Sequence, residues 1–102
     1  MEWYNYIAVF FAGAFLSNAI PHFVKGICGD KFPTPFSKPP GKGLSSPMVN
    51  VLWAFLNIVI GIVLANAGNL HRHNHPAHLV FFIGFIAMSL FSSNGFSKKD
   101  KE

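Results

Sequence analysis

Residues 48–67, MVNVLWAFLNIVIGIVLANA, run for twenty positions without a single charged side chain. An α-helix of this length spans about 30 Å, which matches the hydrocarbon thickness of a bilayer. Two further apolar stretches, at about residues 3–20 and 78–92, lie on either side of it. The three stretches predict an all-α integral membrane protein with three transmembrane helices.

Breaks in the apolar pattern place the ends of these helices. Ser46 can cap a helix and Pro47 suits a first helical position, whereas Gly68 interrupts the pattern. We therefore expect a single membrane domain, 1–102, with the following parts: a helix at about 3–25, a Pro/Gly-rich loop at 26–46, a second helix at about 47–67, a His-rich loop at 68–77, a third helix at about 78–94 and a charged tail at 95–102.

The composition excludes several classes of protein. Only 12% of the 102 residues are charged, about half the share of a soluble domain. The net charge of +4 comes from lysines that flank the apolar stretches, so we expect contact with lipid headgroups and not with nucleic acid. Cys28 is the only cysteine, which rules out an intramolecular disulfide.

The lysines also predict the orientation in the membrane. With three spans, the loop at 26–46 and the tail at 95–102 lie on the same side, and they hold six of the seven lysines, with Lys25 at the adjoining helix end. The loop at 68–77 holds Arg72 alone. Positive residues are retained in the cytoplasm during insertion, so we expect the N-terminus outside and the C-terminus in the cytoplasm.

A polar intramembrane cluster is the first candidate site. Asn18 and His22 are four residues apart and Asn50 and Asn57 are seven apart, so each pair shares one helix face. Polar side chains at this depth normally face protein or water. They could join helices by hydrogen bonds, or they could line a small polar pocket with His22 as its titratable group.

The His-rich loop is the second candidate. Its four imidazoles, from His71, His73, His75 and His78, could bind zinc, copper or nickel. An extended loop would splay the alternating histidines apart, and neither cysteine nor carboxylate lies nearby to complete a tight site. A polar loop that is rich in histidine by composition is the alternative, and we expect no cofactor.

The acidic residues argue against an enzyme. Glu2, Asp30, Asp100 and Glu102 are the only acids, and none lies inside an apolar stretch. We expect a small integral membrane subunit, either homo-oligomeric or an accessory component of a larger membrane complex. The alternative is a channel or transporter for a small solute, ion or proton, lined by the Asn18/His22/Asn50/Asn57 face.

Four segments carry a resemblance to a known family. They are residues 18–23 (NAIPHF), 32–36 (FPTPF), 40–47 (PGKGLSSP) and 50–53 (NVLW). Together they resemble a family of small bacterial inner-membrane proteins of unknown function, over about residues 3–61. The resemblance implies a multi-pass protein of the bacterial inner (plasma) membrane, and it implies no activity. The His-rich loop lies outside it.

Overall fold

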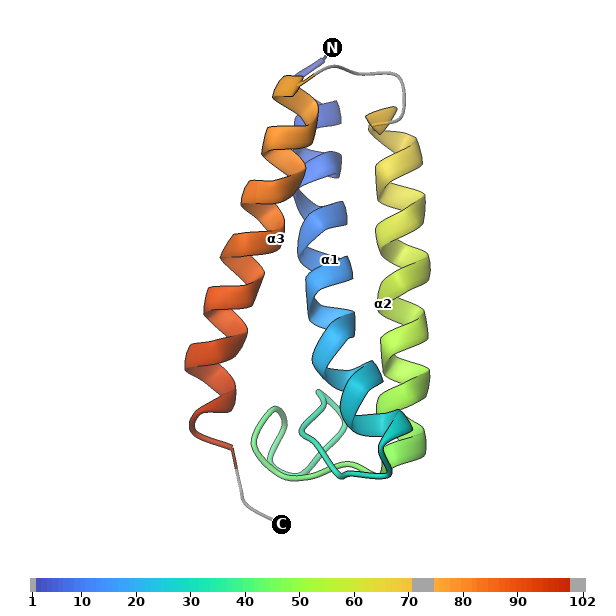
Figure 1. Ribbon diagram of the computed structural model, residues 1–102, viewed down its shortest axis with the longest axis vertical. Helices are drawn as coiled ribbons and strands as arrows, with labels where there is room; N and C mark the ends of the chain where they lie inside the picture. The colour runs from blue at the N-terminus through green and yellow to red at the C-terminus, as the bar shows by residue number, and fades with distance from the viewer. Residues whose placement is uncertain (1, 71–74, 100–102) are drawn as a thin grey trace.

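The protein is built from three helices, α1 (Trp3–Ile27), α2 (Pro47–Ala67) and α3 (His75–Phe96). The computed structural model describes residues 2–70 and 75–99 (Figure 1). Within these ranges there is no strand, and Phe32 and Ser45 form an isolated bridge. Each helix is long and apolar enough to cross a membrane, so the prediction of an all-α protein with three membrane-spanning helices is confirmed.

Two helices differ at their ends from the expected bounds. Helix α1 continues through Gly26 to Ile27. The chain then turns at Gly29, whose φ of 79° suits a residue without a side chain. Helix α3 begins at His75, earlier than expected, because Pro76 fits the first turn of a helix, where a missing N–H is not needed. Helix α2 begins as expected, with the Ser46 side chain accepting a hydrogen bond from the Val49 amide at 3.2 Å, as a capping serine does.

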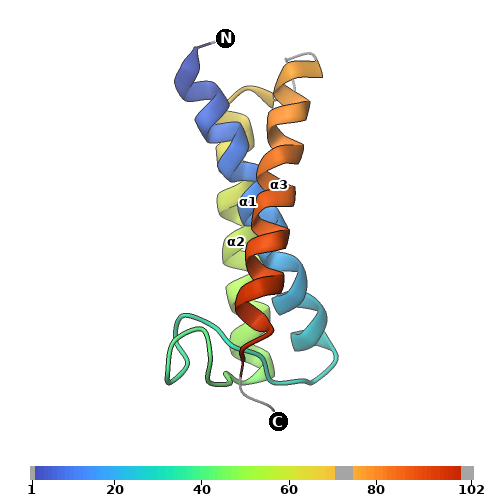
Figure 2. The same ribbon diagram turned by 90° about the vertical axis from the view of Figure 1, so that its left-hand side faces the viewer.

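Helix α1 is the centre of the bundle. Helices α2 and α3 each pack along α1, on different sides of it, and make no comparable contact with each other (Figures 1 and 2). The molecule is 45 Å long and only about half as wide. Each outer helix therefore depends on α1 for its position.

Close contacts at glycines set both helix crossings. A Cβ atom added to Gly13 of α1 would collide with the Phe81 carbonyl of α3, and one added to Gly84 of α3 would collide with the Phe10 carbonyl of α1. At Gly61 of α2 an added Cβ would lie 2.7 Å from the Leu16 side chain of α1. These small residues allow the helix backbones to approach, and they do so within one chain.

The lysines gather at one end of the bundle. The loop between α1 and α2 and the end of α3 meet there, whereas the N-terminus and the end of α2 lie at the opposite end (Figure 1). This lysine-rich end is defined by Lys25, Lys31, Lys38, Lys42, Lys98 and Lys99.

Candidate functional site

The loop between α1 and α2 folds into a compact cap on the lysine-rich end. Thr34, which is buried, is its centre: its carbonyl accepts hydrogen bonds from the Ser37 amide (3.1 Å), the Ser37 hydroxyl (2.7 Å) and the Gly41 amide (2.9 Å). Its hydroxyl lies 2.6 Å from that of Ser45. The backbones of Phe32 and Ser45 exchange two further hydrogen bonds. The proline-rich loop is thus held in one shape by hydrogen bonds between its own backbone and side-chain groups.

Asn50 attaches this cap to α2 and to α1. Its Nδ2 donates to the carbonyls of Phe32 (2.9 Å), Ser46 (3.0 Å) and Ser45 (3.3 Å). Its Oδ1 lies 2.7 Å from Nδ1 of His22. Because carbonyls can only accept, the amide orientation is determined, and His22 Nδ1 must be the donor to Oδ1. Asn50 and His22 are 0% and 1% exposed, so this network replaces water with protein partners.

A second set of polar contacts joins the helices nearer the middle of the bundle. Asn57 donates from Nδ2 to the Trp53 carbonyl at 2.8 Å, which leaves its Oδ1 to accept from Asn18 Nδ2 at 3.1 Å. On the other side of α1, the hydroxyls of Ser17 and Ser89 lie 2.8 Å apart and connect α1 to α3. Both contacts satisfy polar groups at membrane depth.

Aromatic rings enclose His22. Phe32 of the loop, Trp53 of α2 and Phe96 of α3 each meet its imidazole edge to face, at centroid distances of 5.4 Å, 6.4 Å and 5.7 Å, a geometry that aromatic pairs prefer. Phe32 is therefore a buried part of the cap, with the Lys99 ammonium 5.9 Å from its ring centroid, within the range of a cation–π contact. Four separate segments of the chain thus meet around one imidazole.

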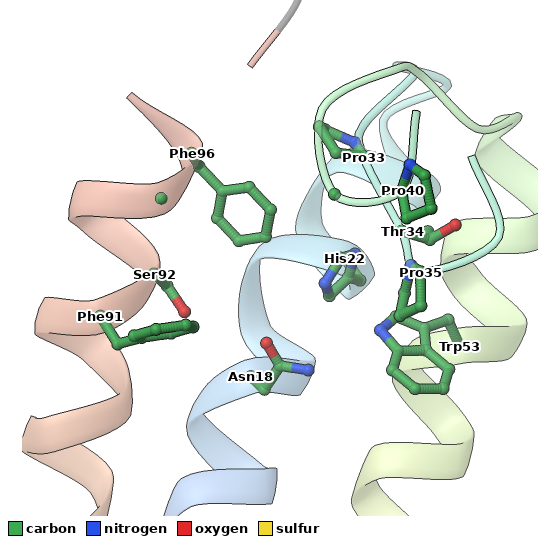
Figure 3. Close-up of a pocket in the computed structure, with 12 residues that line it drawn as sticks. Asn18, His22, Pro33, Thr34, Pro35, Pro40, Trp53, Phe91, Ser92 and Phe96 are labelled. Atoms are coloured by element: carbon green, nitrogen blue, oxygen red, sulfur yellow. The ribbon is translucent and has the colours of Figure 1, made fainter. Parts of the chain in front are cut away.

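A cavity of about 400 Å³ opens beside this imidazole (Figure 3). All three helices and the loop contribute to its lining, which consists of Asn18, His22, Pro33, Thr34, Pro35, Pro40, Gly41, Trp53, Phe91, Ser92, Gly95 and Phe96. Trp53 Nε1 is buried and has no hydrogen-bond partner, the one such side-chain atom in the described part of the chain. A mostly apolar cavity with a few converging polar groups is the usual form of a small-molecule site.

The structure divides the four residues of the polar cluster into two kinds. Asn18 and His22 line the cavity, whereas Asn50 and Asn57 are buried between α1 and α2 and are not part of the lining. The face that a channel would need is thus used largely to join two helices. Trp53, which lies between Asn50 and Asn57 in the same helix, is a further lining residue that the spacing of polar residues did not predict.

The His-rich loop can be followed only in part. His71 and His73 lie outside the described residues, and His75 is the first residue of α3. His78 is exposed one turn further along α3, at the end of the molecule opposite the cavity. Among residues 2–70 and 75–99, no three His, Cys, Asp or Glu side chains come together as a metal site.

The segments that carry the resemblance, 18–23, 32–36, 40–47 and 50–53, all meet at the lysine-rich end. They supply the loop, the Asn50 network and most of the cavity lining. No protein-family model, curated protein or solved structure matches this chain.

Proposed function

We propose that this protein is a small membrane subunit that binds a small apolar or amphiphilic molecule at its lysine-rich end. The observation that carries the proposal is the cavity, in which Asn18, His22 and the unpartnered Trp53 Nε1 converge within an otherwise apolar lining. A buried N–H without an acceptor costs about 1–3 kcal/mol. A bound molecule that accepts this hydrogen bond would remove that cost.

The chemistry of the lining favours binding over catalysis. The residues around the cavity include no carboxylate, thiol or lysine. His22 is the one titratable side chain among them, and Asn50 holds its Nδ1 in a fixed orientation. An acid–base or nucleophilic mechanism needs a partner for this imidazole, and the lining supplies amide, hydroxyl and indole groups instead.

Membership of a larger assembly is the second part of the proposal. Of the two other helices, α3 packs against α1 only, and just 6% of the apolar segment with which it could cross the membrane is buried, against 39% for α1. The glycines at the helix crossings pack against other helices of the same chain, so they are not available for contacts with a second protein. Contacts with further copies or with a larger membrane protein would therefore use the large exposed side chains of α2 and α3, such as Phe55 and Phe82.

The orientation completes the proposal. Lysines at one end of the bundle support a cytoplasmic location for the cap, the cavity and the C-terminus, with the N-terminus outside. The resemblance supports a bacterial inner membrane. In this orientation the cavity lies in the inner leaflet, and the cap separates it from the cytoplasm.

Native mass spectrometry of the protein released from its own membrane tests both parts. Ser92→Phe would fill the cavity, whereas Ser93→Phe places the same side chain at an exposed neighbouring position that does not line it. We expect a bound small molecule in the wild type and in Ser93→Phe, and its loss in Ser92→Phe. The same spectra report copy number and co-purifying chains. A wild-type protein that carries no small molecule, or a bound molecule that Ser92→Phe retains, would contradict the proposed site.

A further inference from the structure

The hydrogen-bonding groups around the cavity can be assigned one by one. Asn18 Nδ2 donates one of its two hydrogens to Asn57, and Asn18 Oδ1, the acceptor of the amide, is directed to the cavity in Figure 3. His22 Nδ1 donates to Asn50, so Nε2 carries a lone pair whenever the imidazole is neutral. Trp53 Nε1 is a donor, on the edge of the indole that faces His22 and Asn18 in Figure 3. The Ser92 hydroxyl can donate or accept.

This set of groups defines what a complementary molecule must offer. It needs an acceptor for Trp53 and at least one donor for Asn18 Oδ1 or His22 Nε2. It must be uncharged in this region, because no charged side chain lines the cavity and a bare charge is costly to bury. A hydroxyl-bearing group meets these needs, since one oxygen can both accept and donate.

The apolar part of the lining favours a ring. Trp53, Phe91 and Phe96 present aromatic surfaces, and Pro33, Pro35 and Pro40 present flat apolar ones (Figure 3). Aromatic side chains prefer to stack on, or meet edge to face, another ring. Water alone would fit poorly, because the cavity of about 400 Å³ has a few polar groups only. A buried water molecule needs about two to four polar partners, so the few polar groups could anchor only part of the water in such a volume.

The surroundings of the cavity favour a ligand that arrives through the membrane. The loop covers it on the aqueous side with Pro33, Thr34, Pro35, Pro40 and Gly41. Helices α2 and α3 both contribute to the lining, but they share no interface comparable to those with α1, so no helix–helix interface covers the cavity between them. A molecule with a long apolar tail could leave that tail in the bilayer while its ring occupied the cavity.

We infer that the cavity binds the ring of a neutral, lipid-soluble quinol, with its hydroxyl groups bonded to Trp53 Nε1 and to Asn18 Oδ1 or His22 Nε2. This inference rests on the proposed function and names the ligand class for the same site. A quinone ring of the same shape has two carbonyls and can only accept, so it would leave Asn18 Oδ1 and His22 Nε2 without donors. The site therefore distinguishes the reduced ring from the oxidised one, and no electron transfer is required.

Equilibrium binding to the full-length protein in lipid nanodiscs tests the inference. The probes are a short-tailed benzoquinol kept reduced, the corresponding quinone, and a monoacylglycerol of matched tail length that has hydroxyls but no ring. We expect the quinol to bind at least tenfold more tightly than the quinone or the monoacylglycerol. Ser92→Phe should abolish quinol binding and Ser93→Phe should leave it unchanged. Trp53→Phe keeps an aromatic ring but removes the N–H, and it should weaken quinol binding about three- to tenfold.

Each other outcome has a definite meaning. Equal or tighter binding of the quinone would refute the assigned donors and acceptors. Equal binding of the monoacylglycerol, blocked by Ser92→Phe, would refute the ring while leaving a ligand site at the cavity. Binding of none of the probes would overturn the quinol assignment, and the native mass of the extracted protein would still decide the proposed function. If Ser92→Phe fails to fold, a Trp53→Phe protein that binds quinol as tightly as the wild type refutes the inference by itself.

Discussion

Replacing Asn50 with alanine should release the cap, whereas the same change at Asn57 should not. Both side chains are buried, at 0% and 1% exposure, and both belong to α2. Truncation to alanine therefore removes the same atoms from two comparably packed positions, and the cost of the void is similar. The two variants differ in what each amide holds.

The hydrogen bonds set the expected magnitudes. Asn50 makes three contacts to other segments, with His22, Phe32 and Ser45, and its loss also leaves the buried His22 N–H without an acceptor. Asn57 makes one such contact, with Asn18. Each bond contributes about 0.6–1.5 kcal/mol. In addition to the cost of the void, Asn50→Ala should therefore lower the free energy of unfolding by about 2–4 kcal/mol and Asn57→Ala by about 1 kcal/mol.

Two measurements separate a local from a global effect. Reversible unfolding in a detergent and dodecyl sulfate series gives the free energy of unfolding of each variant. Trypsin cleavage after Lys31 and Lys42, followed by mass spectrometry, reports opening of the cap. A loss of about 2 kcal/mol in local stability raises the open population about 30-fold, so cleavage should accelerate by a similar factor in Asn50→Ala. Equal destabilisation by the two variants, or a cap in Asn50→Ala as resistant as in the wild type, would refute this account of Asn50.

The helix crossings and the lysines provide three further tests. Gly84→Ala should weaken the docking of α3 by about 1–3 kcal/mol in the same unfolding assay. Gly95→Ala, whose Cβ would meet open space in the same helix, should be neutral or slightly stabilising; equal stability of both variants would contradict the close α1–α3 crossing. Gly61→Leu should lower the melting temperature, because a leucine forces α2 away from α1, and an unchanged value would mean that this position faces lipid. On a Cys28→Ser background, Lys42→Cys should react with a thiol label only from the cytoplasm and Asn69→Cys only from outside; labelling of both from one side would remove the three-span topology.

Part of the site could be anticipated from spacing along single helices. The four-residue interval between Asn18 and His22 and the seven-residue interval between Asn50 and Asn57 placed each pair on one face, and in the structure these faces meet. The alternatives of a hydrogen-bonded interface and a pocket lining could not be separated in this way. In the structure Asn50 and Asn57 belong to the helix interface, whereas Asn18 and His22 both take part in that interface and line the cavity. Spacing along one helix could not show this, because a cavity depends on which residues lie opposite that helix.

Sequence patterns did not predict which side of α3 faces the protein or how the loop folds. Helix α3 has no apolar face that is distinct from a polar one, so periodicity does not show which side faces the protein. In the structure Gly84 and Ser89 lie against α1. Phe32 was equally uninformative, because a phenylalanine among prolines suits a membrane surface as well as a buried cap. Its burial depends on hydrogen bonds to Ser45 and Asn50, which lie 13 and 18 residues further along the chain.

Span length, charge-free runs and capping residues act locally, so the three helices and the asymmetry of the lysines could be predicted from the amino-acid order alone. The central position of α1, the folding of the loop into a cap and the cavity beside His22 became visible in the folded chain and not before. These features arise where four segments distant in sequence meet. That Trp53 Nε1 has no hydrogen-bond partner is evident only in the structure, because the partners of a buried donor are its neighbours in space.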